Sequence, residues 1–191
     1  MLVAAVSVAF AVPLALSPYA PGGDTPWHTA VVAVLAEDDP GRFLGAFEAD
    51  HRFGSYVAVY QALALLARAV GAVAAVNVLC ALYVVGLVWA ARSLARSFGA
   101  DGALAVLAAP AAYSTTLEFG FLSYLPSLPL TLWLWALVRS VMQRGPRPRR
   151  VAAMAGAWLG VSLCHPFAAA VAGLGAGLLW LCELGRDRAG R

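Results

Sequence analysis

Long uncharged runs dominate the chain and mark its expected membrane spans. Residues 1–20, 72–91 and 119–138 each contain no charged side chain. About 20 mostly apolar residues are enough for a helix to cross the hydrocarbon core of a bilayer. A further uncharged run, 102–117, is shorter and contains Pro110. These runs predict four helical crossings.

The last apolar run, 151–182, is too long for one crossing. Its 32 residues, at about 1.5 Å rise each, exceed the ~30 Å hydrocarbon core. Because proline disfavours helical backbone in the residue before it, we expect a helical hairpin that turns at His165-Pro166. The sequence therefore predicts an all-α fold. It is a polytopic membrane helix bundle in one domain, 1–191, with about six spans at 1–20, 71–91, 102–117, 119–138, 151–164 and 167–182.

Residues 1–20 also have the length of a secretory signal. They lack the basic segment with which such a signal begins, and Pro18-Tyr19-Ala20 does not fit a small-x-small cleavage site. We therefore interpret them as a retained first span.

Composition and arginine placement predict the compartment and the orientation. A mean hydropathy of +0.78 is typical of a polytopic membrane protein, and all 13 basic residues are arginine. Lys and Arg accumulate in short cytoplasmic loops. With a cytoplasmic N-terminus, only Arg42, Arg52 and Arg68 lie outside, and the other ten arginines lie inside. We expect an integral protein of a bacterial cytoplasmic membrane with both termini in the cytoplasm. No nucleic-acid partner is expected, since the arginines flank spans.

The external loop, residues 21–70, contains two short helical stretches. The first, 26–37, has apolar positions at helical spacing and predicts a helix with one apolar stripe of Trp27, Ala30, Val31, Val34 and Leu35. The second, 56–70, is mostly apolar but is interrupted by Gln61 and Arg68. Both are too short to cross, so we expect two interfacial helices that lie along the membrane surface near each other.

Polar residues at the external ends of these elements carry the candidate chemistry. Two of them, four residues apart, share one side of a first helical turn, and the others lie in the loops and at the tip of the hairpin. The expected topology places all of them on one side of the membrane: Asp24, His28, Asp50, His51, Arg52, Glu118 and His165. Capping, loop solvation or interfacial polarity would also explain these residue types at such positions.

Metal binding and soluble-enzyme chemistry have little support in the sequence. A solvated helix end explains the acidic run of Glu37, Asp38 and Asp39 better than a metal site, because a hard cation needs several preorganised oxygens. The cysteines have no CxxC spacing and are interpreted as buried, inert thiols: Cys80, Cys164 and Cys182. No P-loop, HExxH or GxSxG motif is present.

The order of these parts resembles a known family. Residues 23–30 (GDTPWHTA) open a surface helix with an acidic residue, and 50–52 (DHR) form a polar turn. A second surface helix carries Tyr56 and Tyr60, and 119–125 (FGFLSYL) open the fourth span. This arrangement resembles the N-terminal half of GT-C superfamily glycosyltransferases, membrane enzymes that take sugars from polyprenyl-phosphate donors.

The resemblance implies an activity and roles for single residues. In such enzymes a first-loop carboxylate acts as general base, or helps to bind a divalent metal where one is used; by position that residue is Asp24. Arg52 and His165 occupy positions that contact the lipid-linked phosphate. The implied partners are the bilayer and a polyprenyl-phosphate-linked sugar donor, and no cofactor other than that metal is implied. The implied substrate-binding set is His28, Asp50, His51, Arg52, Glu118 and His165. Family members usually have more spans, so we expect a fragment of a longer chain or a reduced relative.

Two other functions remain open at this point. A non-catalytic membrane scaffold or assembly subunit would keep the helices without using the external carboxylate. A transporter would need ionisable residues or broken helices near the bilayer midplane, and here the spans carry almost no charge. We rank a glycosyltransferase first, a scaffold second and a transporter third.

Overall fold

The described part of the chain is helical throughout. The computed structural model describes residues 1–37 and 54–189, and these ranges contain no strand. The all-α prediction is therefore confirmed for this part of the chain. The elements in order are α1 (Leu2–Leu16), α2 (Thr25–Ala36), α3 (Val57–Val70), α4 (Ala72–Ser97), the 3-10 helix η2 (Gly102–Leu107), α5 (Ala108–Ala111), α6 (Thr115–Phe119), α7 (Ser127–Arg144), α8 (Pro148–Cys164) and α9 (Pro166–Ala189).

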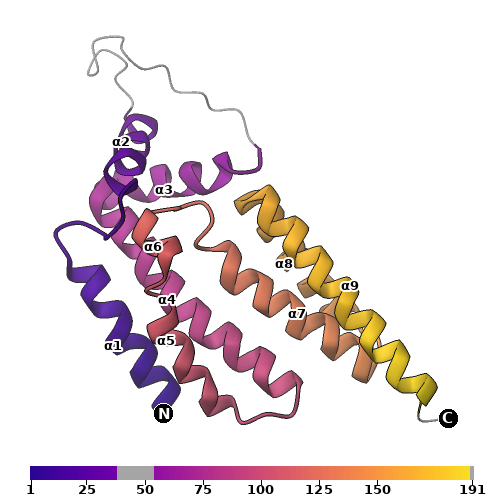
Figure 1. Cartoon of the computed structure of the whole chain (residues 1–191). Helices are drawn as coiled ribbons and strands as arrows, with labels where there is room; N and C mark the ends of the chain where they lie inside the picture. The colour runs from indigo at the N-terminus through magenta and orange to yellow at the C-terminus, as the bar shows by residue number, and fades with distance from the viewer. Residues whose placement is uncertain (38–53, 190–191) are drawn as a thin grey trace.

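Helix α4 is the centre of the bundle. It packs against α1, α2, α3, α7 and the η2–α5 segment. Its inward positions Val76, Cys80 and Val84 are almost completely buried in the main core cluster. Figure 1 shows α2 and α3 at one end of the bundle, with the start of α1 and the end of α9 at the other. The two ends of the described chain therefore lie on the same side.

Two helices of the described part, α4 and the 166–185 portion of α9, are long and apolar enough to cross a bilayer. Only 11% of the apolar α9 window is buried, and large side chains such as Leu174 and Leu178 are exposed. An apolar surface of this kind is suited to lipid and not to water. A membrane helix bundle fits these observations, whereas the number of six spans and the orientation stay predictions.

The expected third span, 102–117, is not one helix. The Asp101 side chain accepts a hydrogen bond from Ala103 N at 2.9 Å and starts the 3-10 helix η2. The short helix α5 follows, and extended backbone at Ser114 (φ −95°, ψ 173°) separates it from α6. The expectation of one continuous helix over 102–117 was wrong. The uncharged composition indicates that the segment is apolar, but it does not indicate where the helix is interrupted.

The expected fourth span, 119–138, begins later and ends later. Gly120 ends α6 in the left-handed conformation, and turns follow until α7 begins at Ser127 and continues to Arg144. Arg139, which was assigned to a cytoplasmic segment, lies inside α7. Its charge is accommodated there by a contact with Glu183 of α9.

The hairpin at His165-Pro166 is confirmed. His165 is extended (φ −159°, ψ 123°) between the end of α8 and the start of α9. A Cβ placed on Gly173 would lie 2.8 Å from the Trp158 ring, so positions nearly equidistant from the turn touch each other. The second arm is longer than the predicted 167–182, because α9 continues to Ala189.

The two helices expected in the first loop are also present, and α2, α3 and α4 pack against one another. The packed face of α2 coincides with the predicted apolar stripe only in part. Leu35 is buried and Val31 packs against the core, but Trp27 is 63% exposed, and the other buried positions are Thr25, His28 and Val32. The polar residues Thr25 and His28 can face inward because hydrogen bonds satisfy their side chains. The orientation of both helices relative to a membrane stays a prediction.

Candidate functional site

The start of α2 is held against the end of α6. Gly23 N donates to Glu118 O at 2.8 Å, and Asp24 N donates to Phe119 O at 3.0 Å. Gly120 (φ +79°) permits this approach, because a Cβ at this position would lie 2.8 Å from Thr25 N. Asp24 and Glu118 therefore lie at the same end of the bundle, whereas their placement on one side of a membrane stays a prediction.

The Asp24 carboxylate does not cap α2. An N-cap residue normally has extended dihedrals that place its side chain over the first free N–H groups. Asp24 instead has right-handed helical dihedrals (φ −91°, ψ −3°) and makes no side-chain capping bond. Its side chain is exposed at the surface of the bundle. The interpretation of Asp24 as a capping side chain was therefore wrong, and its carboxylate is accessible for other chemistry.

Two buried polar side chains join α2 to α3. The Tyr60 hydroxyl and His28 Nδ1 form a hydrogen bond of 2.6 Å, and the residues are only 6% and 9% exposed. Burial lowers the pKa of His28, and the charge of nearby Asp24 opposes this shift in part. Burial also raises the pKa of Tyr60, and the adjacent Tyr56 adds to that shift. Both groups are therefore neutral near pH 7.

Tyr56 has the only positive φ (+75°) among the described non-glycine residues. Two hydrogen bonds hold this strained backbone on the end of α8. Tyr56 N donates to Leu163 O at 2.8 Å, and Ser55 Oγ donates to Ser162 O at 2.6 Å. Strain of this kind persists only where the surroundings impose it, and it is frequent at functional sites.

The position of Tyr56 completes a line of tilted and edge-on rings. Its ring centroid lies 5.8 Å from that of Tyr60 and 5.6 Å from that of His165. The His165 ring also meets Tyr124 edge-on, with centroids 5.2 Å apart. We call the five side chains His28, Tyr60, Tyr56, His165 and Tyr124 the ring row.

His165 contributes an unsatisfied polar atom to the ring row. Its Nδ1 is buried and has no hydrogen-bond partner among the described residues. A buried nitrogen without a partner carries a desolvation cost that a bound ligand would remove. His165 is therefore the member of the ring row best suited to contact a ligand.

The structure brings some of the predicted site residues together. Asp24, His28, Glu118 and His165 lie at the α2–α3 end of the bundle, whereas Asp50, His51 and Arg52 fall outside the described residues. The sequence analysis assigned no site role to Tyr56, Tyr60 and Tyr124, although it noted Tyr56 and Tyr60 at the second surface helix. Tyr56 precedes α3 and has a positive φ, so helical spacing does not describe how these two tyrosines lie.

Metal ligands do not converge in this part of the chain. Among residues 1–37 and 54–189, no three His, Cys, Asp or Glu side chains are placed to hold a metal ion. Comparisons with protein-family models, with curated proteins and with solved structures find no match for this chain. What the site does is therefore inferred from its geometry. An exposed carboxylate can accept a proton, and phenol and imidazole groups beside it can bind a phosphate or a sugar.

Proposed function

We propose that this chain is a membrane glycosyltransferase of the GT-C type, which transfers a sugar from a polyprenyl-phosphate donor on the external face. The observation that carries the proposal is the placement of the Asp24 carboxylate. It is exposed, it does not cap its helix, and it lies at the same end of the bundle as the ring row. The exposed apolar surface of α9 supports a lipid environment beside this end.

Asp24 acts as the general base. The acceptor hydroxyl oxygen forms a bond to the anomeric carbon of the sugar as the bond between that carbon and the phosphate oxygen breaks. The hydroxyl proton moves to the Asp24 carboxylate, and the electron pair of the broken bond leaves with the polyprenyl phosphate. A positioned base of this kind contributes about 10²–10⁴-fold to the rate.

His165 and its two neighbouring tyrosines contact the donor. The unpartnered Nδ1 of His165 supplies a polar atom, and the exposed Tyr56 and the partly buried Tyr124 supply hydroxyl groups and ring faces. Phosphate oxygens accept hydrogen bonds from such groups, and sugar rings pack on aromatic faces. Arg52 adds the positive charge that the family resemblance implies.

His28 has a positioning role in this proposal. Its Nδ1 is committed to Tyr60, and its side chain is buried between α2 and α3. It therefore fixes the direction of α2, and so the place of Asp24, without contact with the substrate.

The test is sugar transfer in membranes that contain the full-length protein, with radiolabelled polyprenyl-phosphate sugars as donors. Asp24→Asn should lose transfer at normal expression, because the amide cannot accept the proton. Asp101→Asn is the matched control: this exposed acid caps η2, and asparagine caps equally well. If wild-type membranes transfer no sugar from any donor, or if Asp24→Asn transfers as well as the control, the proposal is wrong.

A further inference from the structure

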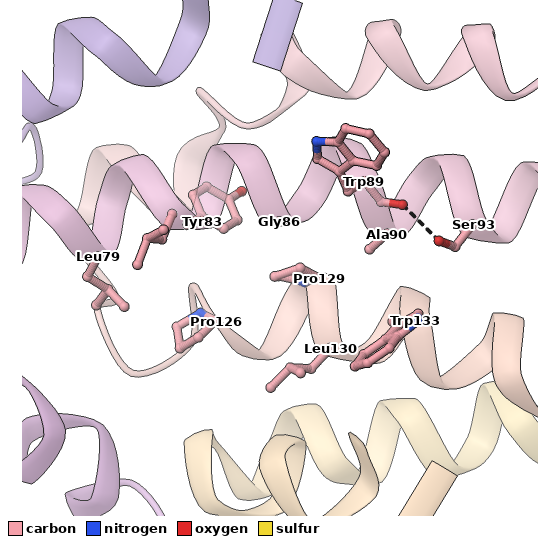
Figure 2. A pocket seen from close by; sticks show the side chains of 11 residues that line it. Leu79, Tyr83, Gly86, Trp89, Ala90, Ser93, Pro126, Pro129, Leu130 and Trp133 are labelled. Atoms are coloured by element: carbon pink, nitrogen blue, oxygen red, sulfur yellow. Dashed lines mark hydrogen bonds between the residues drawn. The ribbon is translucent and has the colours of Figure 1, made fainter. Parts of the chain in front are cut away.

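A long apolar groove separates α4 from α7. Its cavity has a volume of about 430 Å³ and is lined mostly by apolar side chains. Figure 2 shows Leu79, Tyr83 and Gly86 on α4 facing Pro129 on α7 and Pro126 just before it. At Gly86 the two helices lie close together, because a Cβ there would lie 3.4 Å from Pro129 Cβ.

The groove continues into a second, polar cavity. This cavity has a volume of about 230 Å³ and shares Ser93 and Trp133 with the first. Its lining includes Arg96 at the end of α4 and Arg144 at the end of α7. The space between the two helices therefore changes along its length from apolar to cationic.

The two arginines that line the polar cavity have uncompensated charges. Neither guanidinium has an ion pair or a hydrogen bond with another of the described residues. Their neighbour Arg139 differs, because it donates to Ser97 O at 2.8 Å, pairs with Glu183 and stacks on Phe98 at 4.1 Å. The Arg96 side chain packs over Gly102 of η2, since a Cβ on Gly102 would lie 2.8 Å from Arg96 Nε, and Arg144 is exposed at the end of α7. Guanidinium groups without a charged partner beside a cavity are suited to a phosphate group.

The apolar part of the groove has the length of half the hydrocarbon core of a bilayer. From Leu79 to Trp89, both of which line it, the α4 axis rises by about 15 Å at ~1.5 Å per residue. Half of the hydrocarbon core is about 15 Å thick. Trp89 and Trp133 lie on the groove near its cationic end, which is where aromatic side chains mark the membrane interface.

We propose that this groove binds an anionic phospholipid of the surrounding bilayer. The phosphate lies between Arg96 and Arg144, and one acyl chain lies along the apolar groove toward Leu79. The cationic end of this site lies at the opposite end of α4 from the ring row, so the phosphate position is separate from the proposed donor site. It depends on the membrane location of the chain and not on the transfer reaction.

Lipid binding to the purified full chain in detergent tests the proposal, with native mass spectrometry as the measurement. Phosphatidylglycerol and phosphatidylcholine with the same acyl chains are titrated at low salt. An arginine beside an anionic lipid contributes roughly fivefold to binding, so two predict a preference for phosphatidylglycerol of about 25-fold. The double variant Arg96→Gln/Arg144→Gln should bind both lipids about equally.

A matched double variant separates a built site from diffuse charge. Arg147 and Arg149 are exposed on the same side of the bundle but do not line the cavity. Arg147→Gln/Arg149→Gln should keep the preference. Ser93→Leu should weaken binding of the phospholipid, because it fills the junction of the two cavities.

Three results would overturn the proposal. The first is equal binding of phosphatidylglycerol and phosphatidylcholine by the wild type. The second is a loss of the preference for phosphatidylglycerol in Arg147→Gln/Arg149→Gln as complete as that in Arg96→Gln/Arg144→Gln. The third is that glycerophosphoglycerol, which has no acyl chains, competes for the protein as well as phosphatidylglycerol does. None of these measurements uses sugar transfer. The lipid-binding proposal can therefore be supported or overturned whether or not the chain transfers sugar.

Discussion

Replacement of Gly120 by alanine tests how α2 is held at the site. Gly120 has φ +79°, and a Cβ would lie 2.8 Å from Thr25 N and 3.3 Å from Asp24 N. The left-handed conformation alone costs an L-residue about 1–2 kcal/mol. Overpacking against backbone adds about 1–3 kcal/mol. We therefore expect Gly120→Ala to destabilise the protein by about 2–5 kcal/mol and to displace the start of α2.

Gly99 provides the matched control for this substitution. It has a nearly identical φ of +76°, but a Cβ there meets nothing within 4 Å. Gly99→Ala should therefore show only the conformational cost. For a chain of this length, each kcal/mol lowers Tm by about 2–4 °C, so Gly120→Ala should unfold at least ~2 °C below Gly99→Ala.

The cysteines of the chain provide the assay for both variants. Cys80 and Cys164 are buried, and Cys182 is exposed. In detergent, a fluorogenic maleimide should react at once with Cys182 and with the two buried thiols only as the bundle opens on heating. Equal Tm values for the two glycine variants would refute the reasoning, because the close contact of Gly120 with α2 would then carry no energy.

Three further predictions concern the buried pair and the topology. Tyr60→Phe removes the hydrogen-bond partner of buried His28 and should lower the free energy of unfolding by about 1–3 kcal/mol. Tyr124→Phe is the control, because the Tyr124 hydroxyl has no hydrogen bond within the described residues; it should lower Tm less in the same thermal assay. Because burial lowers the folded-state pKa of His28 below its ordinary 6.5, its contribution to stability is present above that pH and is lost as the pH falls below it. Tm should therefore fall on acidification, and His28→Gln should reduce that fall; an unchanged acid dependence would exclude His28 as its cause. The predicted topology places residue 145 in the cytoplasm. In a Cys182→Ala background, the cysteine introduced by Gly145→Cys should therefore not react with an impermeant thiol reagent in intact cells. Labelling of this cysteine would show that the orientation predicted from the arginines is wrong.

The sequence predicted the helices whose ends carry strong local signals. Pro26 lies in the first turn of α2, extended Glu37 follows its last residue, and the proline after His165 separates α8 from α9. These features act through the backbone of one or two residues, so they can be recognised without knowledge of the packing. The same reasoning failed for 102–117, where the Asp101 side chain and extended Ser114 divide an apolar run.

The packed face of α2 and the ring row could not be predicted for a different reason. Apolar periodicity predicts which side of a helix avoids water, but a helix in or near lipid can expose apolar residues such as Trp27. The polar His28 is buried because Tyr60, 32 positions away, satisfies it. The positive φ of Tyr56 depends on its bond to Leu163 of α8. Contacts between residues so distant in the chain have no local signature.

The catalytic role of Asp24 is tested most directly by two readings on the same membranes. One is sugar transfer, and the other is labelling of the protein by a photoreactive polyprenyl-phosphate sugar. Asp24→Asn should be labelled as strongly as the wild type, because the donor contacts at His165 remain, while transfer falls by at least about 100-fold. Normal labelling together with transfer close to that of the wild type would contradict the account, because the carboxylate would then take no part in the reaction.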